Sequence, residues 1–151
     1  MSQVHPYRVS VEWSGAREGS GKVKGEGSGI ELPLGVPKEF GGNGSGTNPE
    51  ELLASAVASC YTITFGIIAG NRKLPVQSIR ATAVGEVEQT GMQFTYKSMT
   101  IKPEIVLAPS ASDEEVKVAE DMAHKADLYC IITNAVRDKV SIQVEPNITR
   151  G

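Results

Sequence analysis

Residues 47–70 read TNPEELLASAVASCYTITFGIIAG, and this segment carries the signals of a long helix. The four residues TNPE offer a capping side chain, a proline suited to the first turn, and negative charge at the positive end of the helix dipole. A helix over about residues 49–70 is therefore predicted. Its apolar stripe is placed on Leu53, Ala56, Val57, Cys60, Ile63 and Ile67. Further apolar residues lie off this stripe, so the helix needs burial on every side.

On the N-terminal side of this helix, the sequence predicts an antiparallel sheet. Residues 7–13 alternate apolar and polar side chains, and residues 22–28 and 30–34 repeat the pattern more weakly. Residues 35–46 contain five glycines and a proline, which indicates an ordered loop. Three strands and this loop are expected to precede the helix.

On the C-terminal side, two long strands are predicted over residues 76–88 and 94–107, joined by a turn. A second helix begins at Ser112, because the sequence SDEE is a capping box. A final strand is predicted over residues 140–144. The whole chain, residues 1–151, is interpreted as one α+β domain.

Composition excludes several classes of function. The chain has 151 residues, of which 22% are charged, and a net charge of −3, which gives no basic surface for nucleic acid. The first ten residues lack the basic and apolar layout of a secretory signal, so a cytoplasmic protein is expected. Serines and threonines interrupt the apolar helix, which favours a buried helix over a membrane span. No phosphate-binding glycine motif and no paired histidines occur, so neither a metal nor a cofactor is expected.

The two cysteines, Cys60 and Cys130, are seventy positions apart, too few and too far apart for a zinc framework. In a reducing cytoplasm such a pair is either two inert core residues or a redox pair. The composition alone leaves both interpretations open.

Three segments of the chain resemble the OsmC/Ohr family, the osmotically inducible and organic hydroperoxide resistance proteins. Residues 36–42, VPKEFGG, are similar to the family's Pro-Lys-Glu-Leu-Gly-Gly loop. Residues 47–60 are similar to its Thr-Asn-Pro-Glu-x-Leu helix, which ends in a reactive cysteine. Residues 130–135, CIITNA, are similar to its Cys-Pro-x-Ser-Asn-Ala segment, with Ile131 at the proline position and Thr133 at the serine position. The likeness is closer to the organic hydroperoxide resistance branch.

This resemblance implies a fold and an activity. The fold would be α+β, with antiparallel sheets wrapped around central helices in an intertwined homodimer. Cys60 would attack an organic hydroperoxide and become a sulfenic acid, and Cys130 would resolve it as a disulfide. The matching active-site arginine and glutamate are Arg17 and Glu50. A dithiol, carried on a lipoylated protein, would reduce the disulfide, and no cofactor would be needed.

Two other functions stay open on the same sequence. One is a thiol redox sensor or small-molecule-binding stress protein with little turnover. The other is a structural dimer in which both cysteines are inert. Catalytic turnover with a dithiol separates the peroxidase from both.

Glu50 and Cys60 cannot meet on one straight helix. They are ten residues apart, which corresponds to roughly 15 Å along the axis. Either the helix breaks between them, or the Glu50 beside Cys60 comes from a second chain. Because neither Pro nor Gly lies between Glu51 and Cys60, the second alternative is favoured.

Overall fold

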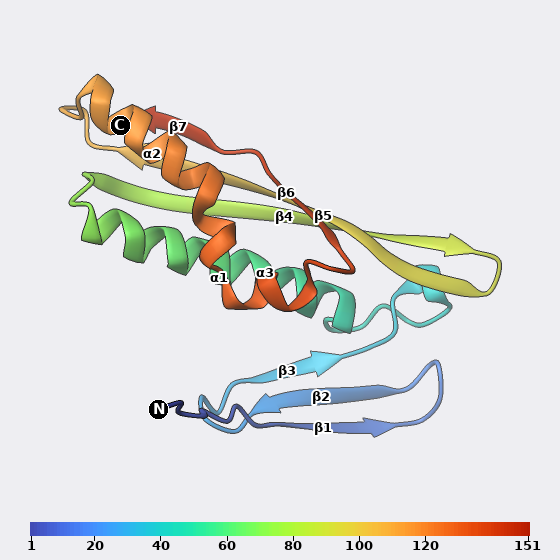
Figure 1. Ribbon diagram of the computed structural model, residues 1–151. Coiled ribbons are helices and arrows are strands. Elements are labelled where there is room, and N and C mark those ends of the chain that lie inside the picture. Colours follow the sequence, from blue (N-terminus) through green and yellow to red (C-terminus); the bar gives the residue numbers. More distant parts are fainter. The chain divides into compact units, whose positions relative to one another are not determined.

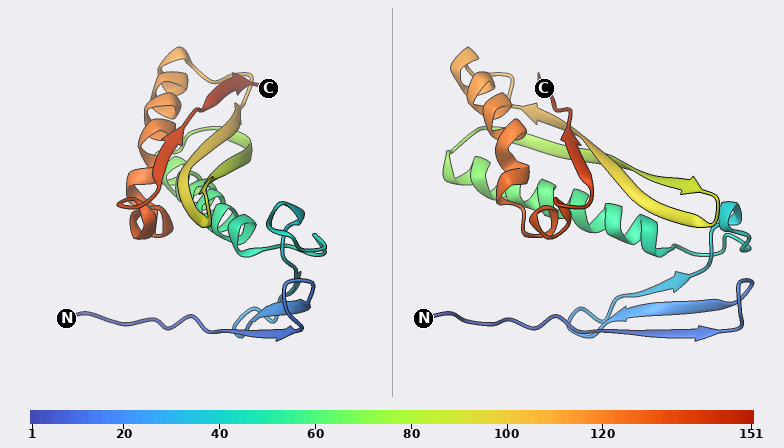
Figure 2. Two further views of the ribbon diagram at one scale, coloured as in Figure 1. Left: turned by 90° about the vertical axis from the view of Figure 1, so that its right-hand side faces the viewer. Right: turned by 45° about the vertical axis from the view of Figure 1, so that its right-hand side comes forward.

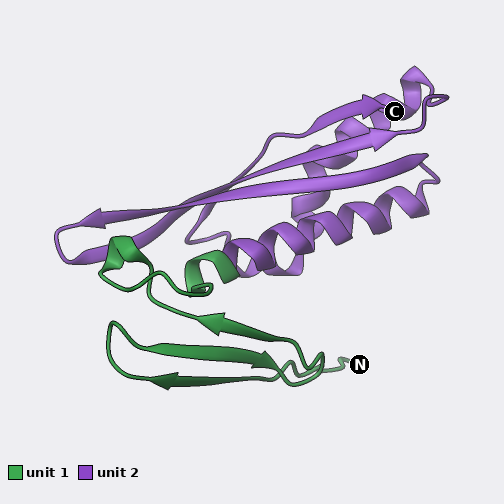
Figure 3. Cartoon of the chain, turned by 180° about the vertical axis from the view of Figure 1, so that it is seen from behind, with its two compact units in different colours: residues 1–52 green, residues 53–151 purple.

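The computed structural model describes all residues from Met1 to Gly151. Contacts divide the chain into two compact units, Met1–Leu52 and Leu53–Gly151, coloured separately in Figure 3. The α+β class predicted from the sequence is confirmed, since the chain combines mainly antiparallel strands with helices, and α1 (Pro49–Asn71) crosses the boundary between the two units. The interpretation of residues 1–151 as one domain stays a prediction.

The first unit contains a three-stranded antiparallel sheet with the order β1-β2-β3. Its strands are β1 (Val9–Ser14), β2 (Ser20–Gly25) and β3 (Glu31–Leu34), close to the predicted strands. A short 3-10 helix, η1 (Lys38–Phe40), forms within the glycine-rich loop that follows. This loop leads to the start of α1.

Helix α1 (Pro49–Asn71) is one unbroken helix of 23 residues. The Asn48 side chain caps it by accepting the Glu51 N–H at 2.8 Å, and Thr47 donates to the Glu51 carboxylate at 2.7 Å. By length and composition alone, α1 could also cross a membrane, a property it shares with core helices of soluble proteins. Only 22% of its most apolar stretch is buried within the chain.

The second unit is a twisted sheet with helices packed on one face (Figures 1 and 2). Strands β4 (Val76–Thr90) and β5 (Gln93–Leu107) form a long antiparallel hairpin, whose far end projects beyond the helices in Figure 1. Strands β6 (Ser141–Val144) and β7 (Asn147–Arg150) both pair with β5 in parallel. The sequence patterns predicted β6 but missed β7.

Three helical segments follow the hairpin. Helix α2 (Asp113–Lys125) begins at the predicted capping box, in which Ser112 and Glu115 exchange hydrogen bonds of 3.0 and 3.1 Å. A 3-10 turn, η2 (Ala126–Tyr129), then leads through Cys130 into the short helix α3 (Ile131–Val136). Sequence patterns did not predict α3.

The core lies between α1, α2 and the inward face of β5. Strand β5 alternates as expected for a sheet with one buried face, and every second residue from Met99 to Leu107 is buried. Helix α1 contributes Val57, Tyr61, Phe65 and Ala69 to this core. The predicted stripe was therefore wrong beyond Val57, because Ile63 and Ile67 are 63% and 60% exposed.

Candidate functional site

Cys60 lies at the middle of α1, one residue before the buried Tyr61. Its side chain is only partly buried, since it lies beside the core-facing stripe of the helix. The Thr64 hydroxyl, one turn further along, lies 4.0 Å from its sulfur. The α1 helix thus presents a thiol that is accessible at one side.

Cys130 lies between η2 and α3 and caps the N-terminus of α3. Its sulfur accepts the Thr133 N–H at 3.4 Å, and the residue is fully buried. A cysteine in this capping position holds the first turn of a six-residue helix that is too short to be stable alone.

The fold brings the two thiols together although they are seventy positions apart in the sequence. The two side chains lie near each other, since each cysteine influences the pKa of the other, and the backbone of Ile131 and Ile132 also influences the pKa of Cys60. Both cysteines are free thiols in this structure. The fold therefore brings two free thiols into one neighbourhood.

The surroundings displace the two pKa values in opposite directions. Burial raises the pKa of the Cys60 thiol, but hydrogen bonds from Cys130, the Ile132 N–H, Thr64 and the Ile131 N–H outweigh it, so the net pKa is lowered. Burial and the contact with Cys60 raise the pKa of the Cys130 thiol. Because two thiolates in contact would repel, the first proton leaves Cys60 and the second stays on Cys130.

A polar network holds the turn that carries Cys130. The Arg137 guanidinium donates to the Asp127 carboxylate at 3.2 Å and to the Asp127 carbonyl at 2.8 Å. It also donates twice to the Asn134 side-chain oxygen, at 3.1 and 3.2 Å, and Asn134 donates in turn to the Leu128 carbonyl at 3.1 Å. Arg137 therefore ties together the segments on either side of Cys130.

Arg17 lies in the first unit, in the connection between β1 and β2. Its guanidinium donates to the Phe40 carbonyl at 3.3 Å. The chain beside it is Gly41, with φ at 85°, and a Cβ there would lie 3.0 Å from the Arg17 side chain. The loop thus fits closely around the arginine, and its contact with Cys60 stays a prediction.

Glu50 lies in the first turn of α1. Since α1 continues without a break from Pro49 to Asn71, the alternative of a broken helix between Glu50 and Cys60 is wrong. The ten intervening steps separate their backbones by roughly 15 Å. A Glu50 carboxylate beside Cys60 would have to belong to another chain.

Sequence reasoning missed the influence of the Ile131 and Ile132 backbone on the pKa of Cys60, and it missed the Arg137 network. The former comes from main-chain groups, which no residue type marks. For Arg137, an isolated arginine seven residues after a cysteine gave no pattern to recognise.

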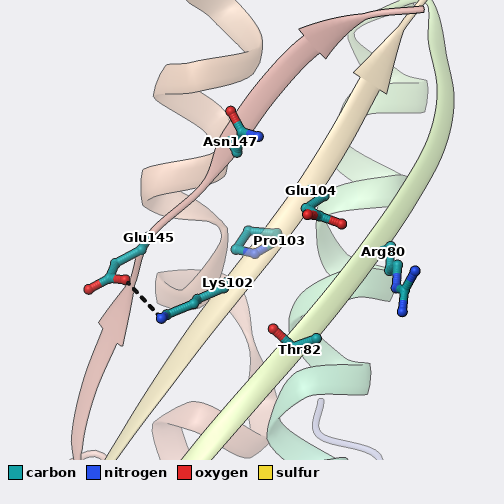
Figure 4. Close-up of a pocket in the computed structure, with 7 residues that line it drawn as sticks. All are labelled: Arg80, Thr82, Lys102, Pro103, Glu104, Glu145 and Asn147. Carbon is teal, nitrogen blue, oxygen red and sulfur yellow. Dashed lines mark ion pairs between the residues drawn. The ribbon is translucent and has the colours of Figure 1, made fainter.

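A shallow depression of about 440 Å³ lies on the outward face of the second sheet (Figure 4). It is lined by Arg80, Thr82, Lys102, Pro103, Glu104, Glu145 and Asn147. Lys102 and Glu145 pair across it at 3.8 Å, as the dashed line shows. This surface contains no thiol and lies on the opposite face of the sheet from the core.

Comparisons with known proteins identify the family. The OsmC-like protein family matches residues 42–145. The uncharacterised protein YmaD of Bacillus subtilis is 32% identical, with 97% of each chain aligned. The organic hydroperoxide resistance protein of Xanthomonas axonopodis is 28% identical over 90% of this chain and 91% of its own. The peroxiredoxin OsmC of Escherichia coli is 25% identical over 89% and 92%.

A solved structure from Vibrio cholerae gives the same result for the fold. It is a putative organic hydroperoxide resistance protein with captopril bound in one of its active sites, 29% identical, with a TM-score of 0.68. The alignment covers 97% of this chain and 94% of that one. Relatives from both branches match at 25% and 28% identity, so the expected preference for the organic hydroperoxide resistance branch is not supported. The chain belongs to the OsmC-like protein family.

Proposed function

We propose that this protein is a thiol-dependent peroxidase that reduces organic hydroperoxides to alcohols. The observation that carries the proposal is the contact between two thiols whose pKa values are displaced in opposite directions, down at Cys60 and up at Cys130. A peroxidase of this kind needs one ionised thiol that attacks the peroxide and a second, protonated thiol that reacts afterwards with the sulfenic acid. The names of the relatives, peroxiredoxin and organic hydroperoxide resistance protein, support the same chemistry.

In the first step, the Cys60 thiolate attacks the terminal oxygen of the hydroperoxide. The O–O bond breaks, the alkoxide takes a proton from solvent and leaves as an alcohol, and Cys60 becomes a sulfenic acid. An ordinary cysteine, with a pKa near 8.5, is only about 3% thiolate at pH 7. The hydrogen bonds to Cys60 increase this fraction, which raises the rate of attack.

In the second step, Cys130 condenses with the sulfenic acid. The Cys130 thiol gives up its proton, its sulfur attacks the Cys60 sulfur, and the hydroxyl leaves as water, so that a disulfide remains. The existing contact between the two side chains favours this step over further oxidation. A dithiol then reduces the disulfide, and a dihydrolipoyl group on a carrier protein is proposed for this role.

We place the working site in a homodimer. Ile63 and Ile67 lie exposed on α1, and burying each in an interface would contribute about 1.5–3 kcal/mol. The length of α1 between Glu50 and Cys60 supports the same assembly, since a partner chain is needed to bring a Glu50 carboxylate to the thiol. Such a carboxylate would orient Arg17 towards Cys60 through a paired hydrogen bond. We propose that the dimer acts in the cytoplasm.

A steady-state assay tests this proposal. Purified protein is given cumene hydroperoxide or hydrogen peroxide, with dihydrolipoamide as reductant, and peroxide consumption is followed. We expect repeated turnover, faster with cumene hydroperoxide, and loss of turnover in Cys60→Ser. A single oxidation without turnover would favour a redox sensor, and a Cys60→Ser variant that kept most of the activity would exclude Cys60 chemistry.

A further inference from the structure

Thr133 lies in the first turn of α3, in contact with the sulfur of Cys130. Its backbone N–H donates to that sulfur at 3.4 Å, and both residues are fully buried. The Thr133 hydroxyl oxygen is buried too, and in this dithiol form of the protein it has no hydrogen-bond partner. Such a group is unusual in a folded protein, because a buried hydroxyl without a partner costs free energy.

The position of this hydroxyl limits the groups that it can serve. It is three bonds from the Thr133 nitrogen and hence within about 4 Å of it, on the same short segment whose N–H contacts the Cys130 sulfur. A threonine hydroxyl in a helix commonly donates to a carbonyl three or four residues earlier, here that of Cys130 or Tyr129. The Thr133 hydroxyl makes neither bond. It is therefore available to the sulfur.

The pKa of Cys130 agrees with this geometry. Burial and the contact with Cys60 raise the pKa of the Cys130 thiol, whereas the Thr133 hydroxyl and N–H act in the opposite direction. A donor lowers the pKa of a thiol by stabilising the thiolate. The two Thr133 donors thus oppose the effect of burial on the ionisation of Cys130.

We propose that Thr133 is a further catalytic residue, whose hydroxyl and N–H together stabilise the Cys130 sulfur as a thiolate while it attacks the oxidised Cys60. This inference rests on the proposed function, because it names the donors for its second step. The Cys130 thiol loses its proton, and the hydroxyl donates to the resulting thiolate. The Cys130 sulfur then bonds to the Cys60 sulfur, the S–O bond of the sulfenic acid breaks, and the departing hydroxide takes up a proton to give water.

Two variants separate the hydroxyl from the packing of the side chain. Thr133→Val replaces the hydroxyl by a methyl group of similar size, and because the hydroxyl has no partner in the dithiol form, the fold should lose no stability. Thr133→Ser keeps the hydroxyl and loses the methyl group. A purely structural role would make serine the more damaging change, whereas a role at the sulfur makes valine the more damaging one.

The test measures attack by Cys130 without any peroxide. One equivalent of 5,5′-dithiobis(2-nitrobenzoate) converts Cys60 to a mixed disulfide, and attack by Cys130 then releases a second coloured thiolate. At about pH 8, loss of one hydrogen bond to the thiolate leaves about tenfold less of it, partly offset by its greater nucleophilicity. The second release should therefore be about threefold slower in Thr133→Val than in wild type, and close to wild type in Thr133→Ser.

Three results would overturn the proposal. They are a wild-type protein without the second release, equal rates in wild type and Thr133→Val, and a Thr133→Ser variant as slow as Thr133→Val. Thr133→Ser and Thr133→Ala form a second pair that differs by the hydroxyl alone, so the test does not depend on the folding of the valine variant. Since no peroxide is used, a negative peroxidase assay and a negative result here are distinguishable.

Discussion

Replacing Arg137 by methionine should destabilise the protein and loosen the turn that carries Cys130. The Asp127 side chain is only 11% exposed, whereas that of Arg137 is 35% exposed. Removing the cation leaves a nearly buried carboxylate without its partner and also removes the bonds to the Asp127 carbonyl and the Asn134 side chain. Breaking a fully buried pair costs about 3–5 kcal/mol, and an exposed pair about 0–1 kcal/mol.

Since Arg137 is partly exposed, we expect an intermediate loss, roughly 2 kcal/mol in the free energy of unfolding. This loss would lower the urea midpoint by about 1 M for a chain of this size, measured at one fixed protein concentration. Lys125→Met is the matched control, because Lys125 pairs with Asp121 at 2.9 Å and both side chains are more than half exposed. The control should change stability by less than about 0.5 kcal/mol.

The same variant should also form the Cys60–Cys130 disulfide more slowly after peroxide treatment, because the Cys130 turn is less firmly held. Quenched-flow alkylation measures this rate. A midpoint shift for Arg137→Met no larger than that for Lys125→Met would refute the reasoning that the Arg137 network stabilises this turn.

Three further results are expected. Burial raises the pKa of the Tyr61 phenol, which donates to the Ala123 carbonyl. The neutral phenol therefore stabilises the fold fully below about pH 10, and this contribution is lost as pH rises above that value. In urea unfolding from about pH 8 to pH 11, the stability of Tyr61→Phe should fall less steeply than that of the wild type, and parallel curves would contradict this. The pKa of Cys60 is lowered, so its alkylation rate should level off at a lower pH than that of a free cysteine peptide, and a midpoint at or above the peptide's would count against it. The double variant Ile63→Lys, Ile67→Lys should sediment as a monomer at micromolar concentration, because it places two charges on the exposed apolar face of α1. The control Glu120→Lys, which changes an exposed residue on α2, should remain a dimer. A dimeric double variant would rule out the Ile63 and Ile67 face of α1 as the interface.

The long elements could be predicted from the sequence because their patterns extend over many residues. Helix α1 and the β4–β5 hairpin are found close to their expected ranges, and Ser112 caps α2 as its motif predicts. The sequence could not show which face of α1 is buried. Apolar residues occur nearly all round this helix, so their spacing does not distinguish a buried face from an exposed one. Tertiary packing, through Tyr61 and Phe65, decides which face is buried.

The short elements could not be predicted because their stability comes from contacts distant in sequence. Helix α3 has six residues and depends on its Cys130 cap and on Arg137, whereas β7 contains one inward apolar residue, Ile148. The cysteine pair was predicted through the family resemblance, and the two residues lie near each other, whereas their catalytic roles stay predictions. The positions of Arg17 and Glu50 at the thiol stay predictions, since the first lies in another unit and the second requires another chain.

The most direct test of the central claim follows both sulfurs after one equivalent of cumene hydroperoxide. Reduced wild-type protein is treated, unreacted thiols are blocked, and peptides are mapped by mass spectrometry, in parallel with Cys130→Ser treated in the presence of dimedone. We predict an intramolecular Cys60–Cys130 disulfide in the wild type and a dimedone adduct on Cys60 in the variant. Unmodified thiols in both proteins, or an adduct located anywhere but Cys60, would contradict the assignment of Cys60 as the attacking thiol.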